Sequence, residues 1–128
     1  MPSEQFERGI EIRKEVLGEE YVTRAMANVD DFNRDFQALL NEYCWGGVWA
    51  REGLSRKQRS LNNLCMLAAL GRSEEFALHF RGALRNGCTL VELRETLLQI
   101  AIYCGMPAAV ESFRIARRVL AESESTAP

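Results

Sequence analysis

The 128-residue chain is poor in the residues that build most metal and redox centres. It contains one histidine, His79, so a mononuclear metal site built on several histidines is excluded within one chain. Its four cysteines are widely separated, and no two of them have the Cys-x-x-Cys spacing of a dithiol redox motif or a zinc knuckle. We therefore expect no metal site. The cysteines are Cys44, Cys65, Cys88 and Cys104.

An excess of charge and a long apolar run are also lacking. Sixteen Lys and Arg residues stand against 18 Asp and Glu residues, which gives a net charge of -2. Nucleic-acid binders carry a basic excess, so no nucleic-acid partner is expected. No run reaches the roughly 18 apolar residues of a membrane span, and the polar start MPSEQFERG does not have the pattern of a secretory signal. These absences predict a cytoplasmic protein with reduced cysteines and no membrane partner.

What the chain does contain is a helical pattern with 47% hydrophobic residues, enough for a core. Serine, threonine and aspartate caps open the predicted helices, and glycines close them. No segment alternates with the period of a strand, so the predicted fold class is all-α with six to seven helices. Residues 1–121 are expected to form a single domain, and 122–128, ESESTAP, a disordered tail. The predicted helices are 3–17, 19–28, 31–43, 55–70, 73–86, 89–104 and 107–121, with the glycine pair at 46–47 breaking the pattern.

Two predicted helices carry more apolar surface than a small chain can cover. The stretch LNNLCMLAAL is apolar on nearly every face, which predicts a helix buried on all sides. The helix over 90–104 has one apolar face at Leu93, Leu97, Ile100 and Cys104 and a second at Val91 and Leu98. A core helix in a bundle is the simpler interpretation. We favour a contact between subunits, since small helical chains rarely hide two faces alone.

His79 lies beside an apolar stripe, on the helix predicted after Ser73. Glu75 lies one turn before it and Gly82 three residues after it, so both share its side of the helix. Glu75 is placed to hold the imidazole, and Gly82 leaves space beside it. His79 is therefore a candidate catalytic residue, and the alternative is a structural histidine next to the core.

Three arginines form a candidate anion site in the segment that leads into the fourth predicted helix. Arg56 and Arg59 share a helix face at i, i+3, near the free backbone N–H groups of a helix N-terminus, and Arg51 precedes them. Such groups bind anions together. The alternative is a solvated basic turn.

Aromatic and acidic residues stand just before these arginines. Trp45, Trp49 and the glycine pair suggest the wall of a pocket, and Glu42 adds a carboxyl group. Cys44 is a candidate nucleophile, although a single cysteine with no histidine beside it usually packs as a small hydrophobe.

The assembled segments resemble the carboxymuconolactone decarboxylase family, in its 4-carboxymuconolactone decarboxylase branch, over nearly the whole chain. The resemblance is densest in NEYCWGGVWAREGLSRKQRSL, GRSEEFALHFRGALRNGCT and ELRETLLQIAIYCGMPAA. The first stretch holds the specific pattern Cys-Trp-Gly-x-x-Trp-x-Arg-x-Gly-Leu. The second holds His-x-x-x-Ala-x-x-x-Gly, which the broader superfamily shares. The resemblance implies a helical bundle of the alkylhydroperoxidase D-like type, assembled as a homo-oligomer, a trimer or hexamer.

The same superfamily contains thiol-dependent peroxidases, which is the alternative function. Those enzymes carry Cys-x-x-Cys four residues before the helix histidine. The corresponding stretch here is Arg72-Ser73-Glu74-Glu75, without either cysteine. The peroxidase alternative therefore loses its main support, and a non-catalytic interaction protein is a third hypothesis.

The resemblance implies 4-carboxymuconolactone, a small dicarboxylate lactone from protocatechuate breakdown, as the substrate, and 3-oxoadipate enol-lactone of the β-ketoadipate pathway as the product. The electron pair left by CO₂ runs through the ring double bond to the lactone carbonyl, so no cofactor is expected. The enzyme must supply cations for a dianion, donors for the enolate oxygen and an acid for the ring carbon.

Under this resemblance we assign catalytic roles to Arg51, His79 and Glu42. Arg51 binds a substrate carboxylate, His79 donates the proton or stabilises the enolate, and Glu42 orients His79 or is itself the acid. Arg56 or Arg59 is the second cationic contact. The remaining expected substrate-binding residues are Trp45, Trp49, Cys44 and Glu75.

Overall fold

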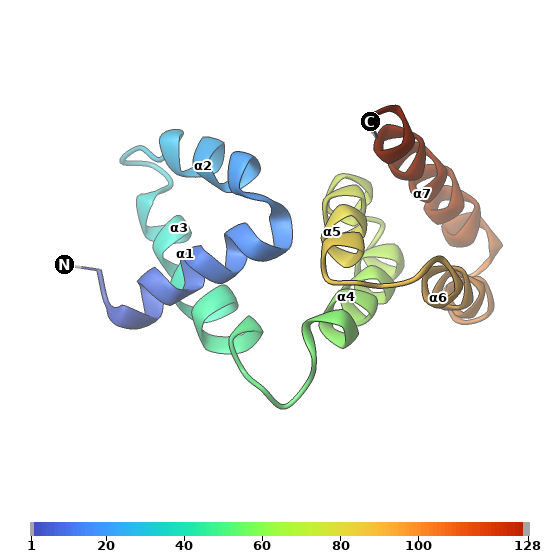
Figure 1. Cartoon of the computed structure of the whole chain (residues 1–128), viewed down its shortest axis with the longest axis horizontal. Helices are drawn as coiled ribbons and strands as arrows, with labels where there is room; N and C mark the ends of the chain where they lie inside the picture. Colours follow the sequence, from blue (N-terminus) through green and yellow to red (C-terminus); the bar gives the residue numbers. More distant parts are fainter. Residues whose placement is uncertain (1, 127–128) are drawn as a thin grey trace. The chain divides into compact units, whose positions relative to one another are not determined.

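The computed structural model describes the backbone of residues 2–126 and the side chains of residues 2–122. All regular structure in this range is helical, with no strand, so the predicted all-α class is confirmed. None of these helices is long and apolar enough to cross a membrane. The elements are α1 (Glu4–Leu17), α2 (Glu19–Ala27), α3 (Arg34–Leu39), η1 (Leu40–Trp49), α4 (Arg56–Leu70), α5 (Ser73–Arg85), α6 (Leu90–Tyr103) and α7 (Met106–Thr126) (Figure 1).

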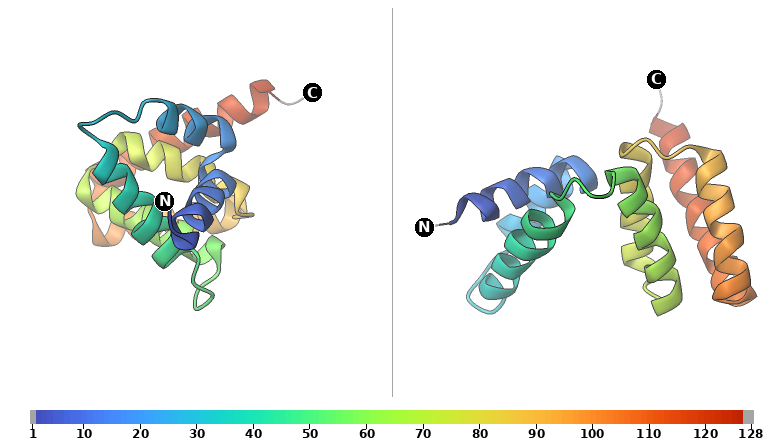
Figure 2. Two further views of the ribbon diagram at one scale, coloured as in Figure 1. Left: turned by 90° about the vertical axis from the view of Figure 1, so that its left-hand side faces the viewer. Right: turned by 90° about the horizontal axis from the view of Figure 1, so that it is seen from below.

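The chain divides into two compact units, Met1–Arg56 and Lys57–Pro128. The N-terminal unit holds α1, α2, α3 and η1, and the C-terminal unit holds α4 to α7. In the C-terminal unit α7 packs against both α5 and α6, and Figure 2 shows these helices beside α4.

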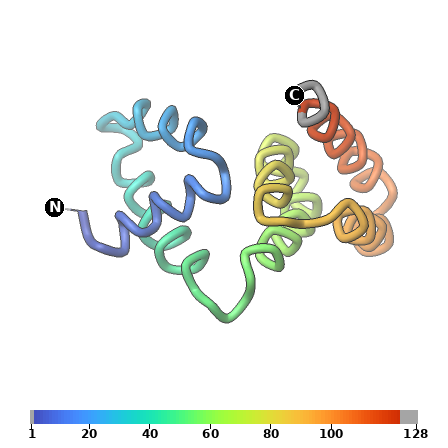
Figure 3. Tube along the Cα trace, in the orientation of Figure 1, coloured from blue at the N-terminus to red at the C-terminus, as the bar shows by residue number. Residues whose placement is uncertain are grey.

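In the N-terminal unit, α1 packs backbone to backbone against η1, a π-helix of ten residues. A Cβ atom on Gly9 would lie 1.8 Å from the carbonyl oxygen of Asn41, and one on Gly46 would lie 2.2 Å from that of Gln5. The predicted break at the glycine pair is wrong, because the chain runs from α3 into η1 without leaving the helix (Figure 3). Gly46 serves instead to admit the neighbouring backbone.

The N-terminal unit also contains a buried charged residue, Arg13 on α1, which is 4% exposed. Its guanidinium donates to the side-chain oxygens of Gln37 and Asn41, each at 3.0 Å. Burial lowers the pKa of Arg13, and the nearby side chains of Tyr21 and Cys44 oppose this change only in part. The polar interior of this unit therefore depends on contacts between α1 and the α3–η1 segment.

The helix predicted over 31–43 begins later than expected, at Arg34. The Asp30 carboxylate accepts from the backbone N–H groups of Phe32 and Asn33, at 3.0 and 3.1 Å, which holds a turn in place of a first helical turn. Phe32 is 89% exposed, and Phe36 and Leu39 are also exposed. These apolar side chains of the 31–43 segment therefore face outward in this chain.

The core of the C-terminal unit lies where α4, α5, α6 and α7 meet. Its largest buried side chains are Phe76, Phe80, Leu64, Leu97 and Ile100. Thr89 and Glu92 form the predicted capping box of α6, with bonds of 2.8 and 3.1 Å between each side chain and the other's backbone N–H.

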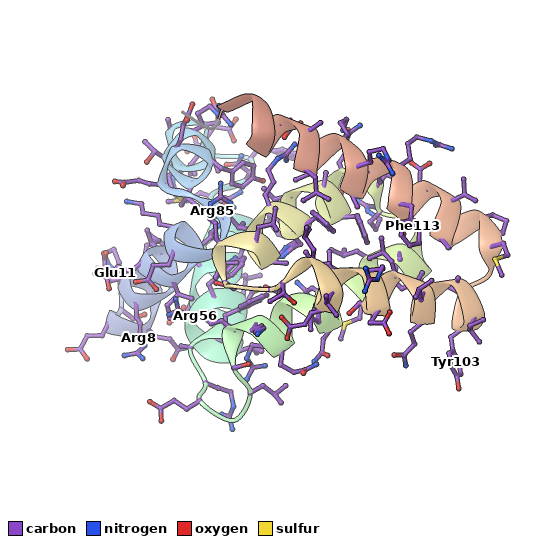
Figure 4. All side chains as sticks on the ribbon, turned by 45° about the vertical axis from the view of Figure 1, so that its right-hand side comes forward. Arg8, Glu11, Arg56, Arg85, Tyr103 and Phe113 are labelled. Atoms are coloured by element: carbon purple, nitrogen blue, oxygen red, sulfur yellow. The ribbon has the colours of Figure 1, made fainter. Side chains whose placement is uncertain are left out.

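Both predicted faces of α6 are present. Leu93, Leu97 and Ile100 are buried, whereas Val91 and Leu98 are exposed and Cys104 does not join the buried face. Tyr103, at the end of the helix, is 83% exposed and projects outward (Figure 4).

In α4, Met66 and Leu70 are exposed in the single chain, so the predicted burial on all sides depends on cover from a second subunit and stays a prediction. Two predictions about the remaining helices differ from the structure. Ser73 is the first residue of α5 rather than its cap, which is Arg72. The last helix continues through Thr126, although a disordered tail was predicted from residue 122; residues 127 and 128 lie outside the described residues.

Candidate active site

His79 lies on α5 and faces α4 within the C-terminal unit. The Asn63 side-chain nitrogen lies 3.3 Å from Nδ1 of His79. Both side chains are partly buried. Glu75, one turn earlier on α5, accepts from Arg72 Nε at 3.0 Å. The side chain that contacts Nδ1 is therefore the Asn63 amide, whereas Glu75 is held by Arg72.

The imidazole of His79 is neutral at physiological pH. Burial lowers its pKa from 6.5 to about 4, and the nearby negative charge of Glu75 opposes this change only in part. The Arg72 guanidinium in turn holds the pKa of Glu75 below its usual range. A neutral imidazole can donate one hydrogen bond and accept another, so His79 is suited to stabilising a developing oxyanion.

The depressed pKa of His79 predicts a loss of stability in mild acid. The unfolded chain binds a proton at His79 near pH 6.5, but the folded chain binds it only near pH 4. This contribution to stability is complete above pH 6.5 and falls by about 2 kcal/mol as the pH approaches 4, after allowance for partial exposure. Urea unfolding between pH 7 and 4 measures it. The matched His79→Gln variant should lose less stability over this window, and identical pH dependence in both proteins would contradict the prediction.

Arg59 lies on α4, one turn before Asn63 and on the same face of that helix. Its Nε atom is buried and has no hydrogen-bond partner within the described part of the chain. Arg56 differs, because its guanidinium pairs with Glu15 of the N-terminal unit. Arg51 is exposed, in the turn after η1. A buried, unsatisfied guanidinium N–H favours an anion, so Arg59 is a better anion contact than Arg56.

The other predicted site residues belong to η1. Trp45 and Trp49 stack with their ring centroids 4.8 Å apart and are 3% and 6% exposed, so they are mostly core residues. The Glu42 carboxylate accepts a hydrogen bond from the Ser3 hydroxyl at 2.8 Å. Cys44 is partly buried, and burial raises the pKa of its thiol. A protonated thiol is a poor nucleophile.

The C-terminal unit thus brings together His79, Glu75 and Asn63, of which Asn63 was missed from the sequence, and it carries Arg59 one turn before Asn63 on α4. The signal available for Asn63 was its i, i+4 relation to Arg59 on a helix face. The N-terminal unit holds Glu42, Cys44, Trp45, Trp49, Arg51 and Arg56.

Redox and metal chemistry find little support in the side chains. Burial raises the pKa of the Cys65 and Cys88 thiols as well as that of Cys44, which disfavours the thiolate that a peroxidase needs. Between residues 2 and 122, no three His, Cys, Asp or Glu side chains gather as ligands for a metal ion. Nothing in this geometry favours the peroxidase alternative.

Comparison with known proteins gives a consistent result. The model of the carboxymuconolactone decarboxylase family matches residues 34–118, which span α3, η1, α4, α5, α6 and much of α7. The 4-carboxymuconolactone decarboxylase of Acinetobacter baylyi is 42% identical over 116 residues, covering 91% of this chain and 87% of that protein. The nitrosuccinic acid decarboxylase of Metarhizium robertsii is 44% identical over 115 residues, covering 90% of this chain and 80% of that protein.

Proposed function

Because the chain belongs to the carboxymuconolactone decarboxylase family, we propose that it is a carboxy-lyase that converts 4-carboxymuconolactone to 3-oxoadipate enol-lactone. The observation that carries the proposal is the 42% identity to a 4-carboxymuconolactone decarboxylase over 91% of the chain. The neutral imidazole of His79 and the unsatisfied guanidinium of Arg59 in one helical unit support it. The reaction would serve protocatechuate breakdown through the β-ketoadipate pathway.

The reaction supplies its own electron sink. The bond between the γ-carbon and the leaving carboxylate breaks, and its electron pair forms a new ring double bond. The original double bond shifts to join the carbonyl carbon and its neighbouring ring carbon. Negative charge then collects on the carbonyl oxygen of the lactone, which gives an enolate. A proton then adds to the ring carbon next to that carbonyl. The chain's side chains need only bind the dianion, stabilise the enolate and provide for this proton, so no cofactor is required.

The proposed roles follow from the state of each group. His79, being neutral, donates a hydrogen bond to the enolate oxygen. Arg59 binds a substrate carboxylate, whereas Arg51, in the N-terminal unit, stays a proposed carboxylate contact on the family resemblance alone. The pairing of Arg56 with Glu15 makes it a positioning residue for the turn before α4.

We further propose that the two compact units act as a single domain, because the family match crosses their boundary at residues 56–57. Glu42, Trp45, Trp49 and Cys44, which belong to the N-terminal unit, stay proposed site residues on the family resemblance alone.

Turnover of the lactone tests the proposed function directly. Purified protein is mixed with 4-carboxymuconolactone, and the loss of ultraviolet absorbance and the release of CO₂ are followed together. We expect equal amounts of lactone consumed and CO₂ released, without added metal or coenzyme. A protein that leaves the lactone untouched would refute this substrate.

Nitrosuccinate is a second candidate substrate, favoured by the 44% identity to a nitrosuccinic acid decarboxylase. It is also a dicarboxylate, and loss of the carboxylate on its nitro-bearing carbon leaves a nitronate, in which the nitro group takes up the electron pair. The same cations and oxyanion donor would serve. Parallel assays with both acids separate the two, and the higher kcat/KM identifies the natural substrate class.

An effect of Arg59 on substrate binding is expected if it contacts a carboxylate. Arg59→Gln should lower kcat/KM about tenfold or more, mainly through KM, because a charge-assisted hydrogen bond is lost. Arg56→Gln should have the smaller effect, since Glu15 already engages Arg56. Arg114→Gln on α7, whose arginine pairs with Glu111, is the charge-matched control. An Arg59→Gln enzyme with unchanged KM would contradict the assignment.

We also propose a homo-oligomer, a trimer or hexamer, in a reducing cytoplasm. Exposed apolar side chains in the turn before α3, on α3 and on the outer face of α6 form surfaces that a second copy would cover. The four cysteines are free thiols, as a reducing compartment would keep them. The exposed apolar side chains include Phe32, Phe36, Leu39, Leu98, Ile102 and Tyr103. Light scattering on the purified protein should give three or six times the 14.5 kDa chain mass, and a monomer would refute the assembly.

A further inference from the structure

We propose that Asn63 is a positioning residue that holds the neutral ring of His79 in the tautomer with its proton on Nε2. The proposal stands on the hydrogen bond between the Asn63 side-chain nitrogen and Nδ1 of His79, at 3.3 Å. This partner of His79 comes from α4, whereas the imidazole lies on α5.

The chemistry of the two groups fixes the direction of this bond. The nitrogen of an asparagine amide donates hydrogen bonds and accepts none. Nδ1 must therefore accept and carry no proton. A neutral imidazole has one protonated nitrogen, so its proton lies on Nε2. The low pKa of His79, caused by burial, keeps the ring neutral and makes the choice between tautomers meaningful.

The surrounding charges do not offer Nδ1 a competing acceptor. The nearest acid on the same helix is Glu75, whose carboxylate accepts from Arg72 at 3.0 Å. On α4, the residue one turn before Asn63 is the cation Arg59, whose guanidinium has no acceptor to offer. The amide donor of Asn63 therefore favours the tautomer with the proton on Nε2.

The consequence for catalysis rests on the proposed function. A proton on Nε2 makes that nitrogen a donor for the enolate oxygen formed when CO₂ leaves. With the other tautomer, Nε2 would present a lone pair to the anion and repel it. Asn63 thus acts through His79 and has its effect on kcat, because the enolate exists only after the carbon–carbon bond breaks.

A spectroscopic test is unambiguous because the chain has one histidine, so every imidazole signal comes from His79. The full-length protein is labelled with ¹⁵N-histidine, and the ring nitrogens are observed at pH 7.5 without substrate. We expect a protonated Nε2 and an unprotonated Nδ1 in the wild type. Asn63→Asp replaces the donor with an acceptor and should place a proton on Nδ1. Asn63→Leu should give a mixture of the two tautomers.

Asn62→Leu is the matched control on the neighbouring position of α4. The Asn62 side-chain oxygen accepts from Gln58 at 2.9 Å, so its loss should leave the His79 spectrum unchanged. A protonated Nδ1 in the wild type, or a spectrum that Asn63→Leu does not alter in a folded protein, would overturn the proposal.

Kinetics supply the second readout. Asn63→Leu should lower kcat about tenfold or more while KM stays within about twofold, and Asn62→Leu should change neither. An unchanged kcat in Asn63→Leu would refute the positioning role. The two proposals fail separately: if the protein turns over no lactone but shows the expected wild-type tautomer, the substrate assignment is wrong and the tautomer assignment stands.

Discussion

Replacing His79 by alanine is expected to lower kcat by about 10²-fold or more, because removal of one oxyanion donor typically costs about 3 kcal/mol in the barrier. The geometry behind this expectation is a neutral imidazole held at Nδ1 by Asn63. KM should change little, since His79 contacts the enolate and not a ground-state carboxylate. Steady-state turnover of 4-carboxymuconolactone by the purified variant measures the effect, with circular dichroism to establish that it is folded.

A second substitution distinguishes the two roles considered for His79. Glutamine keeps a side-chain N–H donor but cannot deliver a proton. If His79 stabilises the enolate by a hydrogen bond, His79→Gln should retain more activity than His79→Ala. If it is the acid, both variants should be equally impaired. A His79→Ala enzyme with the wild-type rate would remove His79 from the mechanism altogether.

The largest effect on stability is expected from Gly9→Ala, which should destabilise the N-terminal unit by about 3 kcal/mol or more. The new Cβ atom would lie 1.8 Å from the Asn41 carbonyl oxygen and 2.9 Å from the Gly46 backbone nitrogen. Both obstacles are backbone atoms, so α1 and η1 must move apart. That movement would also disturb the buried bond between Arg13 and Asn41.

Gly53→Ala is the matched control, because a Cβ atom at Gly53 meets nothing within 4 Å. It should change stability little. Thermal and urea unfolding of both variants measure the difference. If Gly9→Ala unfolds at the wild-type temperature, the close approach of α1 and η1 does not exist in solution.

This contact illustrates a limit of sequence interpretation. The glycine pair at 46–47 resembles a helix break, because glycine is a poor helix former. Here Gly46 lies inside η1 and admits the backbone of α1. Local propensity was overruled by packing between segments more than thirty residues apart, which no pattern within one helix encodes.

The residues of the candidate site also divide into those that helical spacing predicts and those that only packing between helices identifies. The position of His79 beside an apolar stripe, and the arginines near the start of α4, were readable from helical spacing alone. The choice of Arg59 over Arg56 was not, because it depends on Glu15 reaching Arg56 from another helix. The partner of His79 was not readable either, since Asn63 meets it across two helices.

By itself, the sequence determined the helical class, the Thr89–Glu92 capping box, the two-faced character of α6 and the family, all of which rest on residues a few positions apart or on motifs. The tertiary structure alone decided which glycines admit a neighbouring backbone, and which group contacts the imidazole of His79. It also decided that Arg59, and not Arg56, keeps a buried N–H group without a hydrogen-bond partner within the described residues. These depend on how helices pack, and the packing is set by the sum of many weak contacts between distant residues rather than by any short stretch of chain.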